Sequence, residues 1–299
     1  MRFLVTGGAG FLGSELIIEL AKIKGNEIYV FDSYVHGYPE KLTKRQGIKD
    51  LIVGNIKDYS SISRAVEKTV PDVIVHLAAH ITRPESVGEF RTCATTNYVG
   101  IANLLDCCLH DKYRPKKIVF ASSEAIRNPF SHYGISKYAA EQLLEALCPM
   151  AGVKLAILRF SEIYGLSRSQ TSKSLVNFLV DQMVVDQSVA LYDVNRKKDY
   201  VHISDAVKAC KLAIRSKEPL LKVDIGPGDA ITTKKLVEKL RGFMDFKGQF
   251  KYLDFPGVRS VDSIADPLPA KALLGFECQA NFDKELRKLI AKRKKDLSE

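Results

Sequence analysis

Two segments in the middle of the sequence carry side chains that could move a proton together. The stretch YGISKYAAE places Tyr133 and Lys137 four positions apart, and on a helix this spacing puts both side chains on one face. A tyrosine has an ordinary pKa of about 10, so it acts as a base near neutral pH only where a nearby cation stabilises its phenolate. The stretch FASSE ends a strand with two hydroxyls, Ser122 and Ser123, and the acid Glu124. Such a set can remove a proton from an alcohol, although a Tyr–Lys pair at this spacing is also common on protein surfaces.

The glycine-rich segment VTGGAGFLGSEL supplies a second chemical signal. Gly7, Gly8, Gly10 and Gly13 lie between the strand-like run RFLVT and a helical pattern. They fit G-x-G-x-x-G or G-x-x-G-x-x-G, and they could simply allow a tight turn, but a strand, a glycine turn and a helix N-terminus also bind the pyrophosphate of a dinucleotide. Asp32 ends the next apolar run, 19 residues after Gly13, where its carboxylate can accept the ribose hydroxyls of an adenosine. We therefore predict dinucleotide binding, with proton abstraction coupled to hydride transfer to NAD.

The elements around these segments alternate between strands and helices. Six apolar runs are interpreted as strands: RFLVT, EIYVF, DLIVG, DVIVHLA, KIVFAS and KLAILRF. They are continuously hydrophobic, as in parallel strands buried on both faces, and segments with helical spacing separate them. The predicted fold is α/β: a Rossmann-type doubly wound parallel sheet over residues 1–165, and a smaller C-terminal substrate-binding lobe over 166–299 that is interleaved with it.

Composition and charge limit the class of protein. With 299 residues and 46% hydrophobic content, the chain can bury a substantial core. No stretch approaches the roughly 20 apolar residues of a membrane helix, and a strand that starts at residue 2 leaves no room for a secretory signal. Six cysteines without a C-x-x-C pair are typical of reduced thiols in a cytoplasmic protein, and no metal site is expected. The net charge of +10 comes from dispersed basic clusters without interleaved aromatics, which argues against nucleic acid as a partner.

Further motifs follow one another in a characteristic order. They are TGGAGFLGS, Asp32, HLAA at 76–79, Asn97 in NYVG, YGISKYAAE, LRFSEIYG at 158–165, KDYVHISD at 198–205 and AKALLGFE at 270–277. Together they resemble the extended short-chain dehydrogenases/reductases, in the NAD-dependent epimerase/dehydratase group typified by UDP-glucose 4-epimerase. The resemblance extends from residue 2 to about residue 277. It implies NAD as the cofactor, a nucleoside-diphosphate sugar as the substrate, and a homodimer formed through helices near 98–110 and 135–148.

The resemblance also implies roles for individual positions. Tyr133 and Lys137 would be the base and its orienting cation, with Ser123 as the hydroxyl and Glu124 as a further acid or base. The residues implied in cofactor binding are Gly7, Gly10, Phe11, Leu12, Gly13, Asp32, Asn55, Ile56, Leu77, Ala78, Ala79, Asn97, Tyr133 and Lys137. Those implied in substrate binding are Ser122, Ser123, Glu162, Lys198 and Arg259, and the guanidinium of Arg259 would grip the diphosphate. Counted from Glu124, however, SSE is similar to the T-S-E of sugar 4,6-dehydratases and decarboxylases, and Ser122 then takes the hydroxyl role.

The chain departs from the family pattern near the adenine and the sugar. Asn55 and Glu162 stand where the family has aspartate and asparagine, and Lys198 replaces an arginine. The loop between Ser123 and Tyr133 is also short. A shortened loop would leave a more open sugar pocket or alter catalysis.

The function that we expect is an NAD-dependent nucleotide-sugar epimerase. Tyr133 would remove the proton of the 4-hydroxyl as hydride leaves for NAD, and the 4-keto sugar would turn over before hydride returns to its other face. One alternative is a 4,6-dehydratase or related enzyme that uses Glu124 on the same keto intermediate. Another is a non-catalytic NAD-binding protein of the same fold.

Overall fold

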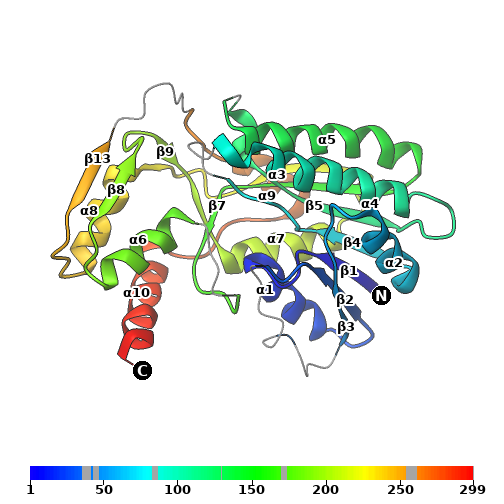
Figure 1. Cartoon of the computed structure of the whole chain (residues 1–299), viewed down its shortest axis with the longest axis horizontal. Coiled ribbons are helices and arrows are strands. Elements are labelled where there is room, and N and C mark those ends of the chain that lie inside the picture. The colour runs from blue at the N-terminus through cyan, green and yellow to red at the C-terminus, as the bar shows by residue number, and fades with distance from the viewer. Residues whose placement is uncertain are drawn as a thin grey trace.

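A seven-stranded sheet organises the larger part of the molecule (Figure 1). The computed structural model describes residues 1–35, 42, 47–82, 87–128, 130–169, 174–253 and 261–298. Across the sheet the strands are β11 (Leu220–Ile225), β6 (Lys154–Phe160), β5 (Lys117–Ser123), β4 (Val73–His76), β1 (Arg2–Thr6), β2 (Glu27–Asp32) and β3 (Ile48–Val53). All neighbouring strands are parallel, and the chain winds outward from β1 toward both edges, which is the doubly wound order. The predicted Rossmann-type sheet is confirmed.

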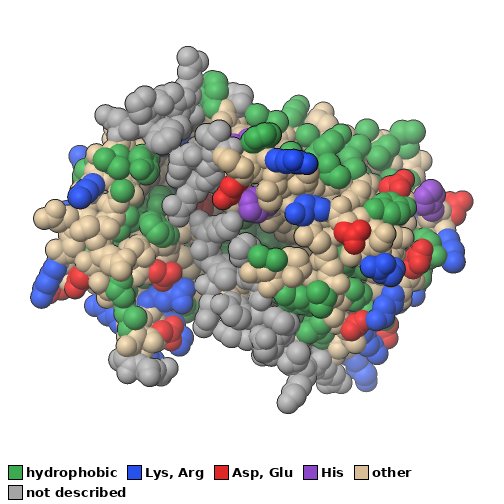
Figure 2. Space-filling view, viewed as in Figure 1, with side chains coloured by type: hydrophobic (Ala, Val, Ile, Leu, Met, Phe, Trp, Pro, Cys, Tyr) green, Lys and Arg blue, Asp and Glu red, His purple; other side chains and the backbone are tan. Residues whose placement is uncertain are grey.

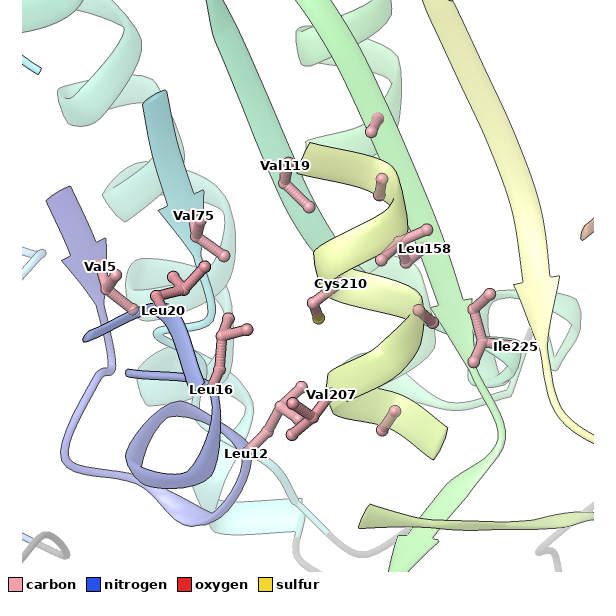
Figure 3. Packing of buried hydrophobic residues seen from close by; sticks show 14 of the residues in the cluster. Val5, Leu12, Leu16, Leu20, Val75, Val119, Leu158, Val207, Cys210 and Ile225 are labelled. Atoms are coloured by element: carbon pink, nitrogen blue, oxygen red, sulfur yellow. The ribbon is translucent and has the colours of Figure 1, made fainter. Parts of the chain in front are cut away.

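Helices cover both faces of this sheet, which explains the continuous hydrophobicity of its strands. One face is covered by α1 (Phe11–Ala21), α7 (Ile203–Arg215) and α9 (Pro267–Leu274). Figure 3 shows the core between the sheet and the first two of these helices. Its labelled members, all buried, are Val5, Leu12, Leu16, Leu20, Val75, Val119, Leu158, Val207, Cys210 and Ile225.

The opposite face carries the helix that bears the Tyr–Lys pair. It is covered by α2 (Tyr59–Thr69), α4 (Gly100–Cys108) and α5 (His132–Met150), and α3 (Phe90–Ala94) and the π-helical turn η3 (Thr95–Val99) lead into α4. Ser131 caps α5, because its Oγ accepts a hydrogen bond from Gly134 N at 3.1 Å. This cap places Tyr133 in the first turn of α5 and Lys137 one turn further along.

A smaller lobe follows β6. Its elements are β7 (Glu162–Tyr164), α6 (Leu175–Val184), β8 (Val189–Tyr192), β9 (Lys197–Lys198), β10 (Tyr200–His202), β12 (Ile231–Thr232), α8 (Thr233–Phe243), β13 (Phe250–Leu253) and α10 (Phe282–Ser298). A separate cluster of buried side chains from α6, α8 and α10 forms its core. Between these elements α7 and β11 return to the main sheet, so the division between residues 165 and 166 stays a prediction.

A buried ion pair fixes α5 on the sheet. Glu141 of α5 is fully buried and binds Arg159 of β6, with Arg159 Nε 3.0 Å from Oε1 and Nη2 2.6 Å from Oε2. Ser122 of β5 donates to the same carboxylate, with its Oγ 2.5 Å from Oε1. A bidentate pair with a third donor offsets the cost of removing both charges from water. The helix is thereby tied to two neighbouring strands.

We expect Glu141→Ala to lower the free energy of unfolding by about 3–5 kcal/mol, because it leaves the mostly buried guanidinium of Arg159 without its partner. Glu238→Ala, at an exposed position of α8, is the matched control and should change the free energy by less than about 0.5 kcal/mol. Urea unfolding followed by circular dichroism measures both. Equal effects of the two substitutions would contradict this role of the ion pair.

Candidate functional site

The glycine turn packs directly against the end of β4. Gly7 has a φ of +68°, and a Cβ atom on it would lie 2.6 Å from Ala78 N. A Cβ atom on Gly13 would lie 2.4 Å from Gly7 O. Only glycine fits at both positions, because any side chain would meet backbone atoms. The turn therefore brings two predicted cofactor-binding segments, residues 7–13 and 77–79, into contact.

The turn leaves the N-terminus of α1 open. Gly10 is the N-cap residue, and no side chain among the described residues caps the helix. Backbone N–H groups in a first turn lack partners within their own helix and favour an anion. The side chains of Phe11 and Leu12 pack in the core, so these residues could bind a pyrophosphate only through their backbone.

Asp32 is positioned by the same turn. Its Oδ2 accepts a hydrogen bond from Ala9 N at 2.9 Å, and its Oδ1 accepts one from Tyr34 N at 2.9 Å. Each carboxylate oxygen retains a second lone pair for a ribose hydroxyl. The glycine cradle, the open helix terminus and this carboxylate together fit a dinucleotide.

The remaining residues predicted at the adenine end have structural partners. Asn55 Oδ1 accepts a hydrogen bond from Lys57 N at 3.1 Å, which fixes the turn after β3. Ile56 is buried and packs closely against Gly100 of α4: a Cβ atom added to Gly100 would lie 2.8 Å from Ile56 Cγ2. Both residues border the end of the sheet next to Asp32, and their contact with an adenine stays a prediction.

The side-chain amide of Asn97 forms hydrogen bonds with other residues of the protein. Its Oδ1 accepts from His80 N at 2.8 Å, and its Nδ2 lies 3.0 Å from His80 O and 2.9 Å from Ser136 Oγ. The amide thus joins the segment after β4 to α5. Asn97 was predicted to bind the cofactor; its described contacts fix His80, directly after residues 77–79, and a contact with NAD stays a prediction.

Ser123, Tyr133 and Lys137 come together at the carboxyl end of β5. The phenol of Tyr133 forms a hydrogen bond with the side chain of Ser123, and this bond partly opposes the rise in its pKa that burial causes. Lys137 lies on the same side of α5, with only 2% of its surface exposed. Its Nζ stands 4.0 Å from the centre of the Phe120 ring, a cation–π contact.

Burial opposes the charged forms of both catalytic candidates. It lowers the pKa of Lys137 to about 7, although the negative charge of Glu141 works against this shift. Burial raises the pKa of Tyr133, and Cys93 raises it further. The phenol therefore needs a positive charge beside it before it can serve as a base near neutral pH.

The two serines at the end of β5 have different partners on α5. Ser122 donates to Glu141 in the third turn of the helix, whereas Ser123 interacts with Tyr133 in its first turn. The structure thus places Ser123, and not Ser122, beside the phenol.

Two serines from later in the chain bind the carboxyl group of Glu124. Its side chain is 2% exposed, with Oε1 2.9 Å from Ser161 Oγ and Oε2 2.8 Å from Ser263 Oγ. Burial raises its pKa to about 7. Both carboxyl oxygens are therefore engaged inside the protein.

The residues predicted to hold the substrate are only partly brought together. Glu162 and Lys198 form an ion pair, with Oε2 and Nζ 3.4 Å apart. The other carboxyl oxygen of Glu162, Oε1, accepts a hydrogen bond from Leu175 N at the start of α6. The two residues that differ from the family pattern, Glu162 and Lys198, thus pair with each other. Arg259 lies outside the described residues.

Sequence reasoning missed several residues that shape this site. Phe120 lies under the Lys137 ammonium, and Cys93 lies close enough to affect both Tyr133 and Lys137. Ser161 and Asp199 contact the Glu124 network. Except for Cys93, these residues occur in the motifs FASSE, LRFSEIYG and KDYVH, but they lie far apart in sequence, and only the fold shows that they meet.

Two further features are absent from the described residues. None of their helices is both long and apolar enough to span a bilayer. No cluster of three or more His, Cys, Asp or Glu side chains in the same part of the chain could hold a metal ion.

Comparison with known proteins places this geometry in a family. The sequence model of the NAD dependent epimerase/dehydratase family matches residues 3–226. A putative UDP-glucose 4-epimerase from Methanocaldococcus jannaschii is 27% identical, with 96% of each chain covered. A UDP-N-acetyl-alpha-D-glucosaminuronate decarboxylase from Bacillus cytotoxicus is 28% identical, covering 93% of this chain and 92% of that one. Among solved structures, a UDP-glucose 4-epimerase from Thermotoga maritima has a TM-score of 0.89 at 28% identity, covering 99% of this chain and 100% of that one.

These relatives are named for different reactions, so the comparisons establish the family without fixing the reaction. The match spans most of the chain and includes the glycine turn, Asp32 and the Ser123–Tyr133–Lys137 group. This chain therefore belongs to the NAD-dependent epimerase/dehydratase family, whose members are enzymes that act on nucleotide sugars.

Proposed function

We propose that the protein is an NAD-dependent nucleotide-sugar 4-epimerase that works through a 4-keto intermediate. The observation that carries this proposal is the position of Glu124, whose two carboxyl oxygens are engaged by Ser161 and Ser263. Dehydration would need a further acid and base for the C5 proton and the departing C6 hydroxyl. With Glu124 turned into the protein, the groups left beside Tyr133 suffice for oxidation and reduction at C4.

The chain's own residues divide the chemistry between them. Tyr133 would take the proton of the 4-hydroxyl, Ser123 would hydrogen-bond the same oxygen, and the Lys137 ammonium would stabilise the phenolate. NAD, when bound by the glycine turn and Asp32, would accept hydride from C4 and return it. Its positive nicotinamide ring would also supply the charge that the buried phenol requires. The structure of the Thermotoga maritima relative was solved with UDP-glucose, which supports a UDP-sugar as the first substrate to test.

Tyr133→Phe should reduce turnover by about 10²–10⁴-fold, because it removes the general acid–base group while it preserves the ring. Tyr252→Phe, at an exposed position of β13, is the control and should turn over near the wild-type rate. UDP-, GDP-, CDP- and dTDP-sugars are incubated with each protein, and the products are identified by mass and NMR. Wild-type turnover in Tyr133→Phe would place the base elsewhere. A product lighter by one water that disappears in Glu124→Gln would favour a 4,6-dehydratase.

The carboxylate of Asp32 should make the protein select NAD over NADP. It would repel a 2′-phosphate, and no lysine or arginine follows it before Lys41 in the sequence. We expect NAD to bind at least about tenfold more tightly, a difference of about 1.4 kcal/mol, and Asp32→Asn to narrow the gap. Calorimetric titration with both dinucleotides measures this preference. Equal affinities in the wild-type protein would contradict it.

A homodimer through α4 and α5 is part of the proposal. Part of each helix is buried in the monomer, but an apolar groove of about 450 Å³ remains between them, lined by Ala102, Leu105, Asp106, Leu109, His110, Leu143 and Leu147. Tyr98, Val99, Ile135 and Tyr138 are exposed on η3 and α5. Figure 2 shows hydrophobic side chains spread over the upper right of the molecule, where Figure 1 places these helices. An exposed apolar face of this kind is typical of an interface between protomers.

Light scattering at micromolar concentration should therefore give the mass of two chains, and Ile135→Glu should shift it toward one, because a charge would be buried at the interface. Leu268→Glu, which changes an exposed apolar residue of α9, is the control and should leave the dimer intact. A monomer in the wild-type protein would contradict this part of the proposal. Cytoplasmic localisation stays a prediction.

A further inference from the structure

A chain of four polar residues crosses the boundary between the large sheet and the smaller lobe. Ser263 Oγ lies 2.8 Å from Glu124 Oε2, Glu124 Oε1 lies 2.9 Å from Ser161 Oγ, and the same Ser161 Oγ lies 3.2 Å from Asp199 Oδ2. Glu124, Ser161 and Asp199 are almost completely buried. A Cβ on Gly226 would lie 2.1 Å from Ser161 Oγ and 2.6 Å from Asp199 Oδ2, so the backbone closes over this pair.

Counting protons shows that the two acids cannot both be ionised and satisfied. Ser161 has one hydroxyl proton, yet two carboxyl oxygens lie within hydrogen-bond distance of its Oγ. If both acids were charged, one oxygen would face the serine without a proton, and two negative charges would be buried side by side. One additional proton on either carboxyl group completes every hydrogen bond of the chain.

The surroundings assign this proton to Glu124. Asp199 accepts three backbone N–H groups, from Tyr200, Gly228 and Ala265, and such bonds favour its ionised form although burial raises its pKa. Glu124 receives only hydroxyl groups, and the charges that face it are those of Asp199 and Asp224.

The charge on Asp224 is already matched within the cluster. Arg127 forms an ion pair with Asp224, with Nη2 2.5 Å from Oδ2. The guanidinium is therefore committed to that carboxylate rather than to Glu124.

We propose that Glu124 is held in its protonated form, as the middle of a hydrogen-bond chain from Ser263 to Asp199, and so positions residues 261–265 of the smaller lobe against the end of the catalytic strand. In this chain Ser263 donates to Glu124, protonated Glu124 donates to Ser161, and Ser161 donates to Asp199. Glu124 directly follows Ser123, and Ser263 pairs with Lys198 of β9 in a β-bridge. The chain thus connects the hydroxyl side of the proposed site with a residue predicted to hold the substrate.

Ionisation of Glu124 weakens this connection. A buried carboxylate regains water only if residues 261–265 move away. Opening of the segment therefore becomes easier as the pH rises from 4.5, the ordinary pKa of a glutamate, to about 7, the pKa of Glu124 in the closed state. Above pH 7 the opening equilibrium no longer changes. Glutamine reproduces the protonated acid, since its amide NH₂ donates to Ser161 and its oxygen accepts from Ser263. Glu124→Gln should therefore keep the segment closed at every pH.

Hydrogen–deuterium exchange of peptides that cover 261–266 tests the chain without any substrate. The ratio of the wild-type exchange rate to that of Glu124→Gln should rise at least about tenfold between pH 5 and pH 7.5, because each pH unit between the two pKa values changes the opening equilibrium up to about tenfold. Glu238→Gln, at the exposed position on α8, should exchange like the wild type at both pH values. A wild-type to Glu124→Gln ratio that is the same at pH 5 and pH 7.5 would overturn the proposal, since it would mean that opening of the segment is not linked to the protonation of Glu124.

A kinetic test adds the link to catalysis, and this part rests on the proposed function. Glu124→Leu, which keeps the volume but cannot hydrogen-bond, should raise KM for the nucleotide sugar about fivefold or more, the effect of about one lost hydrogen bond. Glu124→Gln, unlike Glu124→Leu, should keep KM at the wild-type value and leave kcat within about tenfold of the wild type. Loss of kcat in Glu124→Gln without a change in KM would overturn the positioning role. If no sugar is turned over, the proposed function fails while the exchange measurement still decides the protonation of Glu124.

Discussion

The position of α5 on the sheet decides whether Tyr133 can reach Ser123. That position depends on the buried group in which Glu141 of α5 binds Arg159 of β6 and Ser122 of β5. Because Ser122 anchors the third turn of the helix, the neighbouring Ser123 is left to meet the phenol in its first turn. One strand therefore supplies both the structural attachment of the helix and the hydroxyl of the site. The same anchor holds Lys137 above Phe120, one turn after Tyr133.

Burial then sets the electrostatic character of the site. A dry environment raises the pKa of Tyr133 and lowers that of Lys137 to about 7, so neither group is held in its charged form by the protein alone. The glycine turn and Asp32 offer a place for a dinucleotide on the neighbouring strands. Under the proposed function, the positive nicotinamide ring of NAD would stabilise the phenolate, so proton abstraction would depend on an occupied cofactor site.

Much of the fold could be predicted from the sequence because its signals are local. Continuous apolar runs indicate parallel strands, and the glycine spacing with Asp32 indicates a dinucleotide site. The two serines could not be distinguished in the same way, since their roles depend on Glu141 and Arg159, which come from other elements. Glu124 likewise resembled an acid or base within its motif, whereas its partners Ser161 and Ser263 lie 37 and 139 residues away in the chain. Such contacts arise from the topology, and no local pattern encodes them.

The central claim is that C4 of a nucleotide sugar loses a hydride to NAD and regains it on the other face. The most direct test is to incubate the protein with UDP-glucose that carries deuterium at C4 and to analyse the product by mass spectrometry and NMR. The proposed epimerase should give a product of unchanged mass with inverted configuration at C4 and the deuterium still on that carbon. A product that has lost water, or one in which solvent hydrogen has replaced the deuterium at C4, would contradict it.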